Sequence, residues 1–563
     1  MRFPNITRFL TGVAIPVSSL RSKSSCGIGE FPDLVLFGDW CRRTGLDLIQ
    51  ILPVNDTGFD PSPYNARSAF ALNPVYIRLE DLPGWEICRD DIRDARQRFE
   101  APEKLQYQAV LRFKLAILER IFKHNHAAIS ADNSLRQWMR ANPWLVTYTE
   151  YAGQKTDLFY GWIQFHLERQ LTAAAHALHV MGIALKGDIP ILLSPQSADV
   201  HFNPSLFDTS LRVGAPPDMF SKDGQNWRFP SFRWPEMQRD DYAWWRSRVE
   251  RASRFFHACR IDHVLGFFRV WVIPESVDSA ALGFFEPAKR ISGDVLSKEF
   301  GLKAHEIEDL VQSHALVRTE TGYAPAWYWH HSPALMRIDD KSGGKLRALI
   351  HAYWNGQEEP WREHGRRVLG AIAESTDMLL CGEDLGVIPG CVPEVLEDLD
   401  ILGLRVERWS DKNGQLCNPI DYPRLTVSTT STHDSSTLRC WWQEHGWNRH
   451  QYFAGLHLPG NCPDYLTTEV CAAIVERQMK SNSLIAVLPL QDLFALHYDL
   501  RTMDPHAERI NVPGVESDNN WTYRMKLPIE ALLAYDAYND YVKGFITRRR
   551  NRTLSGIPSL QTV

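Results

Sequence analysis

Residues 255–263 read FFHACRIDH, a largely apolar run that stops at an arginine, an aspartate and a histidine. A buried strand of a parallel sheet is apolar along its length, and (β/α)8 barrels carry their catalytic groups where such strands end. We therefore interpret residues 255–263 as one strand of a parallel barrel. Five more short apolar runs stop at polar, mostly acidic residues: 46–54 at Asn55 and Asp56, 183–186 at Asp188, 378–381 at Glu383, 425–432 at Asp434, and 484–490 at Asp492.

The segments between these runs have helical periodicity in several places, most clearly at 161–181, 240–258 and 361–374. One aspartate after a strand is more often the N-cap of the next helix than a functional group. Six such endings in one chain are hard to explain by capping alone, so the alternation predicts an α/β protein with a (β/α)8 TIM barrel. The spacing does not say which of the six endings carries chemistry.

Two stretches interrupt the alternation and are expected to be inserted helical subdomains. Residues 84–160 are charged and helix-like, with no apolar run that ends in an acid. Residues 275–360 lie between the strands expected to carry Asp262 and Glu383, and part of this stretch, 292–314, has an amphipathic helical pattern. No low-complexity linker or internal repeat divides the chain, so we interpret residues 1–563 as a single elaborated catalytic domain.

The bulk composition argues against several classes of partner. A net charge of −6 and a pI near 6.4 lack the basic footprint of a nucleic-acid-binding protein. No apolar stretch reaches the roughly 18–20 residues that a membrane helix needs. We therefore predict neither a nucleic-acid partner nor a membrane. The aromatic content is high, with 19 Trp, 18 Tyr and 26 Phe; most of these rings belong to a large core, and the excess is weak support for a sugar ligand.

The ten cysteines are scattered, with no CxxC pair and no spacing that predicts a zinc site or a disulfide framework. Cys259 and Cys381 lie inside apolar runs, where a small buried thiol is the default. We predict no metal and a reducing, cytoplasmic setting. The run 9–17 resembles the apolar part of a signal peptide, but Pro16 interrupts it and no cleavage site follows, so we expect none.

Three of the acidic endings suit the cleavage of a glycosidic bond with retention. That chemistry needs an ionised nucleophile and a second carboxyl group that stays protonated until it acts as an acid. Asp262 fits the first role, because Arg260 would face the same side of the strand and keep it ionised; a structural Arg–Asp pair is the alternative. Glu383 fits the second, because the charge of neighbouring Asp384 would disfavour its ionisation. Asp434 is a third acid.

The motifs around these acids, RIDH (260–263), GEDLG (382–386) and THD (432–434), resemble those of retaining α-glucan enzymes. Further motifs narrow the resemblance to the 4-α-glucanotransferases, also called amylomaltases or disproportionating enzymes, of glycoside hydrolase family 77. The similarity extends from about residue 12 to residue 540. It rests on SPYNARSAFALNP (62–74), GDIPILLSPQSADV (187–200), GAPPDMFSKDGQNW (214–227), QDLF (491–494) and RINVPG…NNWTYR (509–524).

The resemblance implies a role for each candidate residue. Asp262 would be the nucleophile, Glu383 the acid and base, and Asp434 the stabiliser of the transition state, whereas Asp188 is either structural or functional. No cofactor and no metal are implied, and the partners would be α-1,4-glucans, maltose, maltooligosaccharides and glucose. Substrate-binding residues would be Ser62, Tyr64 (stacked on the sugar at the cleavage point), Asp218, Gln225, Trp227, Arg260, His263, His433 and Asn511.

Within the family, the pattern resembles the plant-cytosolic, maltose-using branch. RIDH and GEDLG are separated by about 120 residues, and both GFFRVWVIP (266–274) and HDSSTLRCWW (433–442) resemble that branch. The branch carries N-terminal starch-binding modules, whereas the barrel predicted here starts near the beginning of the sequence. Arg228 stands where glycine is usual and His201 where an aromatic residue is usual, so we expect the subsites near them to depart from the family pattern.

We therefore predict a retaining 4-α-glucanotransferase that moves glucosyl or maltooligosaccharyl units between α-1,4-glucans. Hydrolysis and transfer share the first half-reaction, and they differ in whether water or a sugar 4-hydroxyl attacks the glucosyl-enzyme. The alternatives are an α-amylase-type hydrolase and a non-catalytic glucan-binding protein on a degenerate barrel. The sequence does not specify the oligomeric state, the donor length or the natural acceptor.

Overall fold

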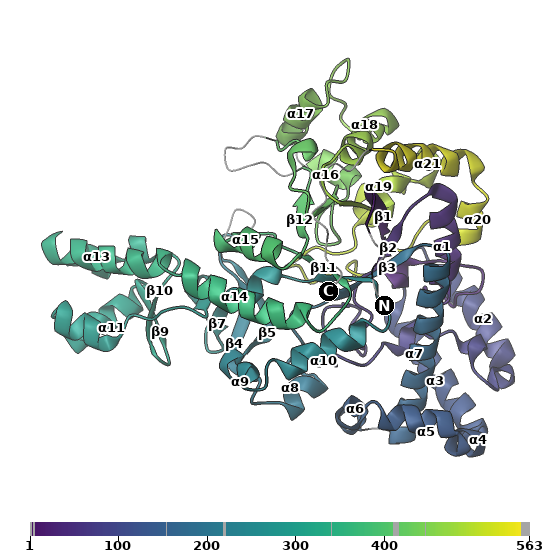
Figure 1. Ribbon diagram of the computed structural model, residues 1–563, viewed down its shortest axis with the longest axis horizontal. Coiled ribbons are helices and arrows are strands. Elements are labelled where there is room, and N and C mark those ends of the chain that lie inside the picture. Colours follow the sequence, from purple (N-terminus) through teal and green to yellow (C-terminus); the bar gives the residue numbers. More distant parts are fainter. Residues whose placement is uncertain are drawn as a thin grey trace.

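Eight parallel strands form the centre of the structure, a computed structural model that describes residues 3, 6–153, 155–217, 221–338, 340–408, 416–444 and 446–552. Helices surround these strands (Figure 1). Their order in the sheet is β11-β6-β3-β2-β1-β14-β13-β12, with parallel pairing throughout. The strands are β1 (Leu10–Ala14), β2 (Leu48–Gln50), β3 (Ala184–Ile189), β6 (Ala258–Ile261), β11 (Leu379–Gly382), β12 (Gly403–Val406), β13 (Thr426–Thr429) and β14 (Ile485–Pro489).

The two edges of this sheet meet and close it into a barrel. The amide of Leu402, just before β12, donates to the carbonyl of Leu380 in β11 at 3.0 Å. The amide of Gly382 in turn donates to the carbonyl of Leu402 at 2.8 Å. This parallel bridge joins the first and last strands of the sheet order. The predicted (β/α)8 barrel is therefore confirmed.

Six of the eight strands coincide with the six apolar runs of the sequence, and two do not. β1 lies in the run 9–17 that resembles a signal peptide; it pairs with β2 on one side and β14 on the other. β12 (GLRV) is four residues long, and Leu404 and Arg405 in it are only partly buried, so it has no continuous buried run. Neither strand shows the long apolar run ending at an acid that marks the other six.

The helices that follow the strands lie close to where their periodicity predicts them. α7, expected at 161–181, begins after Thr156, whose hydroxyl accepts a hydrogen bond from the amide of Phe159 at 3.3 Å. Among the described residues, no helix has both the length and the apolar content to cross a bilayer. The helices around the barrel include α1 (Asp33–Thr44), α7 (Asp157–Val180), α10 (Ala243–Ala252), α14 (Glu358–Ala373), α15 (Cys391–Asp398), α18 (Thr468–Met479) and α21 (Asp536–Arg550).

Five α-helices occupy the described part of the stretch between β2 and α7, where the sequence is charged and helix-like. They lie together on one side of the barrel, at the lower right of Figure 1. Their apolar side chains, including Leu111, Leu118 and Leu135, belong to the same core cluster as the barrel side chains. These helices therefore pack onto the barrel. They are α2 (Arg89–Glu100), α3 (Tyr107–His124), α4 (His126–Ala131), α5 (Asn133–Arg140) and α6 (Trp144–Ala152).

A second sheet, of four antiparallel strands in the order β5-β4-β7-β8, lies beside the barrel. β4 and β5 form a hairpin before β6, and β7 and β8 follow Asp262 in the chain. The sequence did not predict this sheet, because β4 and β5 mix buried, partly buried and exposed residues and have no continuous apolar run. The strands are β4 (Phe207–Ala215), β5 (Gln225–Phe232), β7 (Val270–Pro274) and β8 (Phe284–Glu286).

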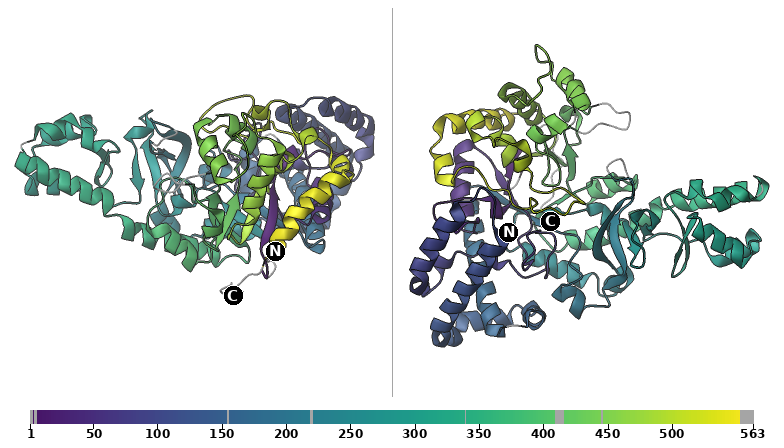
Figure 2. Two further views of the ribbon diagram at one scale, coloured as in Figure 1. Left: turned by 90° about the horizontal axis from the view of Figure 1, so that it is seen from above. Right: turned by 180° about the vertical axis from the view of Figure 1, so that it is seen from behind.

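Residues 287–357 form an arm that extends away from the barrel (Figures 1 and 2). The arm has an apolar cluster of its own, which includes Ile291, Leu310 and Ile350 and is separate from the barrel core. Helices are present as expected, but a two-stranded antiparallel pair lies among them and was not predicted. The elements are the π-helix η7 (Val295–Glu299), α11 (Ala304–Gln312), β9 (Leu316–Thr319), β10 (Gly322–Pro325), η8 (Trp329–His331), α12 (Pro333–Arg337) and α13 (Asp340–Asn355).

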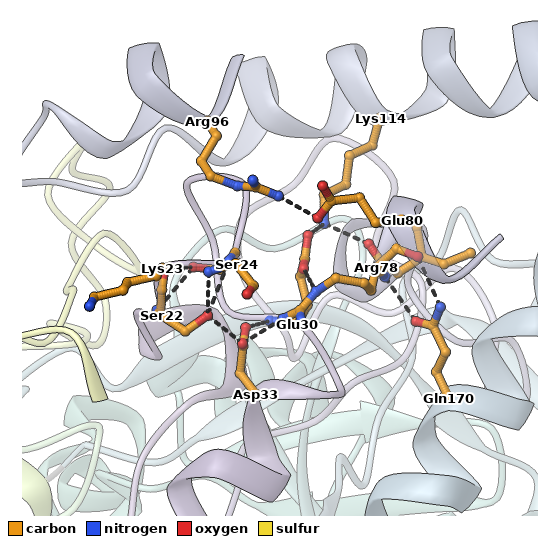
Figure 3. Close-up of polar contacts among 12 residues, drawn as sticks. Ser22, Lys23, Ser24, Glu30, Asp33, Arg78, Glu80, Arg96, Lys114 and Gln170 are labelled. Carbon is orange, nitrogen blue, oxygen red and sulfur yellow. Dashed lines mark hydrogen bonds and ion pairs between the residues drawn. The ribbon is translucent and has the colours of Figure 1, made fainter. Parts of the chain in front are cut away.

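A buried charged cluster fastens α3 to the N-terminal part of the barrel (Figure 3). The ammonium group of Lys114, which is fully buried, donates to Glu30 at 2.6 Å and to two backbone carbonyls at 2.7 and 2.8 Å. Glu30 also forms an ion pair with Arg78, which pairs with Asp33 as well. Such a cluster is stable only while each buried charge keeps its partners.

Replacing Lys114 with methionine is expected to lower the free energy of unfolding by about 3 kcal/mol, because Glu30 then keeps a single cationic partner. The matched control is Lys123→Met on the same helix, where the side chain is 71% exposed; a surface change of this kind is expected to stay within about 0.5 kcal/mol. Thermal and urea unfolding of the two variants measure the difference. Equal losses in both variants would contradict the role given to the buried cluster.

Candidate active site

The side chain of Arg260, on β6, lies at the centre of three carboxyl groups. Its Nη1 is 3.0 Å from Asp262 Oδ1, and it donates to the two carboxylate oxygens of Asp188 at 3.0 and 2.9 Å. Its Nη2 is 3.7 Å from Glu383 Oε2. The three acids lie at the carboxyl ends of β6, β3 and β11, which are neighbours in the barrel. One cation therefore faces three acids, an arrangement that favours a proton on one of them.

The environment of Glu383 favours its protonated form. Burial raises its pKa to about 8; Arg260 opposes this shift, and the charge of Asp262 adds to it. The amide of His263 donates to its Oε2 at 2.9 Å and fixes the orientation of the carboxyl group. The sequence pointed to Asp384 as the cause of a raised pKa, but its effect is a minor one, because Asp384 has its own ion pair with an arginine at 2.9 Å.

Asp434, just beyond β13, has an environment that favours its ionised form, whereas that of Glu383 favours the protonated form. Burial alone would raise its pKa, but the neighbouring His433 and the hydrogen bond from Asn511 more than offset this effect and lower the pKa to about 2. His433 Nε2 is 3.0 Å from Asp434 Oδ2, and Asn511 Nδ2 donates to Oδ1 at 2.7 Å. Asp434 is therefore ionised across the whole range in which Glu383 changes its charge.

Tyr64 forms an aromatic wall on one side of these acids. Its ring stacks on His433, with centroids 5.0 Å apart and an angle of 11° between the planes. Its hydroxyl donates to Asp188 Oδ2 at 2.8 Å. Trp521 completes the wall, with centroids 5.9 Å from Tyr64 and 6.2 Å from His433. The sequence left Asp188 undecided and did not single out Trp521, although it lies in the quoted NNWTYR motif; the structure places both in the site.

His263 connects the acids to the β4–β5 hairpin. The ring of Trp227 meets it edge-on, with centroids 5.0 Å apart, and Trp227 Nε1 donates to Gln225 Oε1 at 3.0 Å. Burial lowers the pKa of His263 to about 4, so its imidazole is neutral at neutral pH. A neutral imidazole has one donor and one acceptor nitrogen, which suits contact with sugar hydroxyls.

Four residues singled out in the sequence lie apart from this group or cannot be placed. Ser62 lies in the loop before Tyr64, where its amide donates to a nearby aspartate at 2.8 Å, and Asp218 falls outside the described residues. Arg228 has a left-handed backbone (φ 64°), a conformation that glycine adopts without strain. The left-handed backbone at this position explains why glycine is usual there. His201, on α8 (Ala198–Phe202), packs against two aromatic rings.

A small cavity lies beneath the acids, inside the barrel. Its volume is about 60 Å³, enough for a few water molecules and well below the roughly 300–1,000 Å³ of a typical ligand pocket. The polar lining of the cavity includes Gln50, Lys186, Arg260, Glu383, Thr432 and His433.

The fold and the site together define a class of enzyme. A (β/α)8 barrel presents, at its strand ends, one carboxyl group that can change its charge near neutral pH and another that stays ionised. Paired carboxyl groups whose pKa values are pushed apart are the equipment of enzymes that break and remake glycosidic bonds.

Comparison with known proteins narrows this class to one family. The sequence profile of the 4-α-glucanotransferases, glycoside hydrolase family 77, matches residues 15–158 and 150–528. The 4-α-glucanotransferase DPE2 of Oryza sativa subsp. japonica is 31% identical over 656 residues, covering 95% of this chain and 69% of the rice protein. The 4-α-glucanotransferase of Chlamydia trachomatis is 30% identical over 571 residues, covering 94% of each chain.

Two solved structures share the fold. Amylomaltase from Streptococcus agalactiae in complex with acarbose has a TM-score of 0.70 at 19% identity, over 97% of this chain and 100% of that chain. Amylomaltase from Corynebacterium glutamicum has a TM-score of 0.71 at 20% identity, over 96% and 75% of the two chains. The chain belongs to the 4-α-glucanotransferase family, retaining transferases that disproportionate α-1,4-glucans, and the resemblance seen in its motifs is confirmed.

Proposed function

We propose that Asp262 is the nucleophile, Glu383 the acid and base, and Asp434 the stabilising carboxylate of a double displacement on α-1,4-glucans. The observation that carries this proposal is the separation of pKa values, about 8 for Glu383 and about 2 for Asp434. An acid/base must change its charge near neutral pH, whereas a group that stabilises positive charge in the transition state must not. Of the other two acids beside Arg260, Asp188 already accepts hydrogen bonds from Arg260 and Tyr64. Asp262, 3.0 Å from Arg260, is therefore the acid that we assign as the nucleophile.

In the first half-reaction, an Asp262 oxygen attacks the anomeric carbon of the donor sugar. A bond forms between that oxygen and the carbon as the glycosidic carbon–oxygen bond breaks, and Glu383 gives its proton to the departing 4-oxygen. Asp262 loses its negative charge in the covalent bond while Glu383 gains one. Because Arg260 faces both groups, the total charge beside it stays constant through the step.

In the second half-reaction, Glu383 acts as a base. It takes the proton from the 4-hydroxyl of an acceptor glucan, whose oxygen attacks the anomeric carbon and displaces Asp262. Two inversions give net retention and return both carboxyl groups to their starting charges. Water in place of the acceptor would give hydrolysis, so transfer depends on how well acceptor sugars exclude water from the site.

The other residues of the site support this chemistry by holding the donor sugar. Tyr64 and Trp521 offer aromatic surface to an apolar sugar face, and the neutral His263 offers hydrogen bonds to its hydroxyl groups. Asn511 fixes the orientation of Asp434 through the 2.7 Å hydrogen bond. The remaining residues that we propose for substrate binding are Ser62, Asp218, Gln225, Trp227, Arg260 and His433.

The product profile from maltose tests the proposed function directly. A transferase converts maltose into glucose and a ladder of longer maltooligosaccharides, with one new glycosidic bond for each bond cleaved. An α-amylase-type hydrolase would produce glucose alone and a matching rise in reducing ends. A non-catalytic glucan-binding protein would leave maltose unchanged. A second incubation, with maltose plus glycogen, shows whether a long branched glucan is used as the acceptor.

The pH dependence follows from Glu383. Its pKa is about 8 in the folded protein and 4.5 ordinarily, so the group is mostly protonated at neutral pH and loses its proton as the pH rises through about 8. Only the protonated form can assist the leaving group, so kcat/KM for maltose is expected to fall about tenfold per pH unit above pH 8. Initial rates between pH 6 and pH 10 measure this limb. A profile that stays level to pH 9.5 would contradict the acid role.

We also propose how the chain is organised and where it acts. The helices at 84–160 and the segment 275–360 are insertions in one catalytic domain that extends over residues 1–563. Maltose, maltooligosaccharides and glucose are the small partners, and the setting is the cytoplasm. The support for a cytoplasmic setting is chemical. Cys259 and Cys381 are free cysteines buried in barrel strands, and unpaired cysteines are typical of proteins in reducing compartments.

A further inference from the structure

Three side chains with different ligand atoms meet at a place that the proposed reaction does not use. Cys440 and Glu444 lie on α16 (Leu438–Glu444), and His506 lies on the 3-10 helix η11 (Pro505–Glu508). Cys440 Sγ donates to Glu444 Oε1 at 3.1 Å and lies 3.2 Å from His506 Nδ1. His506 Nδ1 is 3.8 Å from the same Glu444 oxygen.

These separations match three corners of a small tetrahedron. A zinc ion binds sulfur at about 2.3 Å, imidazole nitrogen at about 2.0–2.1 Å and carboxylate oxygen at about 2.0–2.2 Å. At a tetrahedral angle, those bond lengths place the ligand atoms about 3.4–3.6 Å apart. The three separations in the structure differ from these values by no more than about 0.5 Å, which small rotations of the side chains can absorb.

From this geometry we propose that Cys440, Glu444 and His506 form a binding site for a divalent transition metal of the Zn²⁺ type, with water as the fourth ligand. Thiolate and imidazole ligands favour such ions over Mg²⁺ or Ca²⁺, which prefer oxygen. On binding, a metal–sulfur bond forms, the S–H bond breaks, and the thiol proton passes to the solvent. The thiolate and the carboxylate together balance the two positive charges of the ion.

The three ligands are accessible to solvent on one side, and their neighbouring contacts are compatible with a bound metal. Cys440 is buried, but the side chains of Glu444 and His506 are 25% and 57% exposed, so the site opens to solvent on one side. Ser436 holds the second oxygen of Glu444. Arg509 lies 3.3 Å from Glu444 Oε1; because a carboxylate oxygen has two lone pairs, that oxygen can keep the arginine and still bind a metal in place of the thiol proton.

A metal bound by Cys440, Glu444 and His506 would also affect Asp434, because the ligands lie on the two segments that hold this acid. α16 begins four residues after Asp434, and His506 lies five residues before Asn511. The two segments already meet at the site itself, where Asn511 Nδ2 donates to Asp434 and the Asn511 amide donates to the carbonyl of His433 at 3.1 Å. A metal held by Cys440 and His506 would fasten the same two segments a second time. It would therefore stabilise the arrangement that holds Asp434.

Cobalt(II) is the probe for this site, because tetrahedral Co²⁺ bound by a thiolate has an intense sulfur-to-metal absorption and strong visible bands. The full-length protein, stripped with EDTA, is expected to bind one Co²⁺ per chain with these bands, and Zn²⁺ is expected to displace it. Zn²⁺ should also raise the thermal midpoint of the protein by several degrees. Cys440→Ser should abolish both the absorption and the thermal shift.

Three further variants separate this site from adventitious binding. Glu444→Gln and His506→Ala, at partly exposed positions, should each weaken Co²⁺ binding by at least tenfold, which covers the case in which Cys440→Ser fails to fold. Cys462→Ser, a partly buried cysteine outside the cluster, should bind Co²⁺ as the parent protein does. Co²⁺ spectra without the sulfur band, or bands that survive both Glu444→Gln and His506→Ala, would overturn the proposal.

Discussion

Asp262→Asn is expected to lower kcat/KM for the disproportionation of maltose by on the order of 10⁴-fold or more, the scale seen when a catalytic nucleophile is removed. The amide cannot form the covalent glucosyl intermediate, so both half-reactions are lost. An activated donor such as α-glucosyl fluoride should not restore the rate, because a better leaving group does not replace the missing nucleophile. Glucose release from maltose and fluoride release from the activated donor measure the two effects.

The control for Asp262→Asn is Asp278→Asn, an exposed aspartate in the loop after β7, which should keep the activity of the parent protein. The substitution at 262 should not unfold the chain, because Arg260 keeps its hydrogen bonds to Asp188. A thermal midpoint near that of the parent protein would verify this. Residual activity within 100-fold of the parent protein would rule out the role of Asp262 as the nucleophile.

Glu383→Gln is expected to lower kcat/KM for maltose by about 10³-fold, within the range for loss of a general acid. The departing 4-oxygen of a glucan is a poor leaving group and needs the proton that glutamine cannot supply. Fluoride leaves without a proton, so the initial burst of fluoride release from α-glucosyl fluoride should slow by less than about tenfold. The steady state should remain slow, because the acceptor hydroxyl still lacks a base.

Two observations distinguish this effect from simple damage to the site. The alkaline fall in kcat/KM above pH 8 should disappear in Glu383→Gln, because that limb reports the proton of Glu383. Glu397→Gln, an exposed change on α15 after the same strand, should leave both the rate and the pH profile intact. If Glu383→Gln slowed the initial burst of fluoride release from α-glucosyl fluoride as much as it slows the reaction of maltose, the acid role would be wrong.

Much of the fold could be predicted because most barrel strands have a sequence signature. Runs such as 255–261 are largely apolar and stop at an acid, and six of them match six of the eight strands. β1 was not predicted because its run ends without an acid, and the second sheet was not predicted because β4 and β5 are only partly buried. The sequence of one strand does not indicate which strands pair with it. Neither the order of the strands nor the bridge at Leu402 that closes the barrel could therefore be predicted.

The acids of the candidate active site could be predicted from the sequence, but the contacts between residues distant in the sequence could not. The motifs singled out Asp262, Glu383 and Asp434, and the structure brings the first two to one arginine. The hydrogen bond from Tyr64 to Asp188 joins residues 124 positions apart, and no local pattern indicates such a contact. The same is true of Cys440 and His506, separated by 66 positions. The cause of the raised pKa of Glu383 is burial, a property of the folded barrel, which a neighbouring Asp384 in the sequence could not reveal.

The pairing of β1 with β14 has a consequence for the order of events while the protein is being synthesised. β1 is synthesised before the other strands of the barrel but has to wait for residues 485–489 before its second neighbour exists. Trp521 and Asn511, which complete the site around Tyr64 and Asp434, emerge later still. A chain that stops before residue 485 therefore lacks β14 and the residues that complete the site. It is expected to be inert toward glucans and not a water-accessible hydrolase, so the cell gains activity only from finished chains.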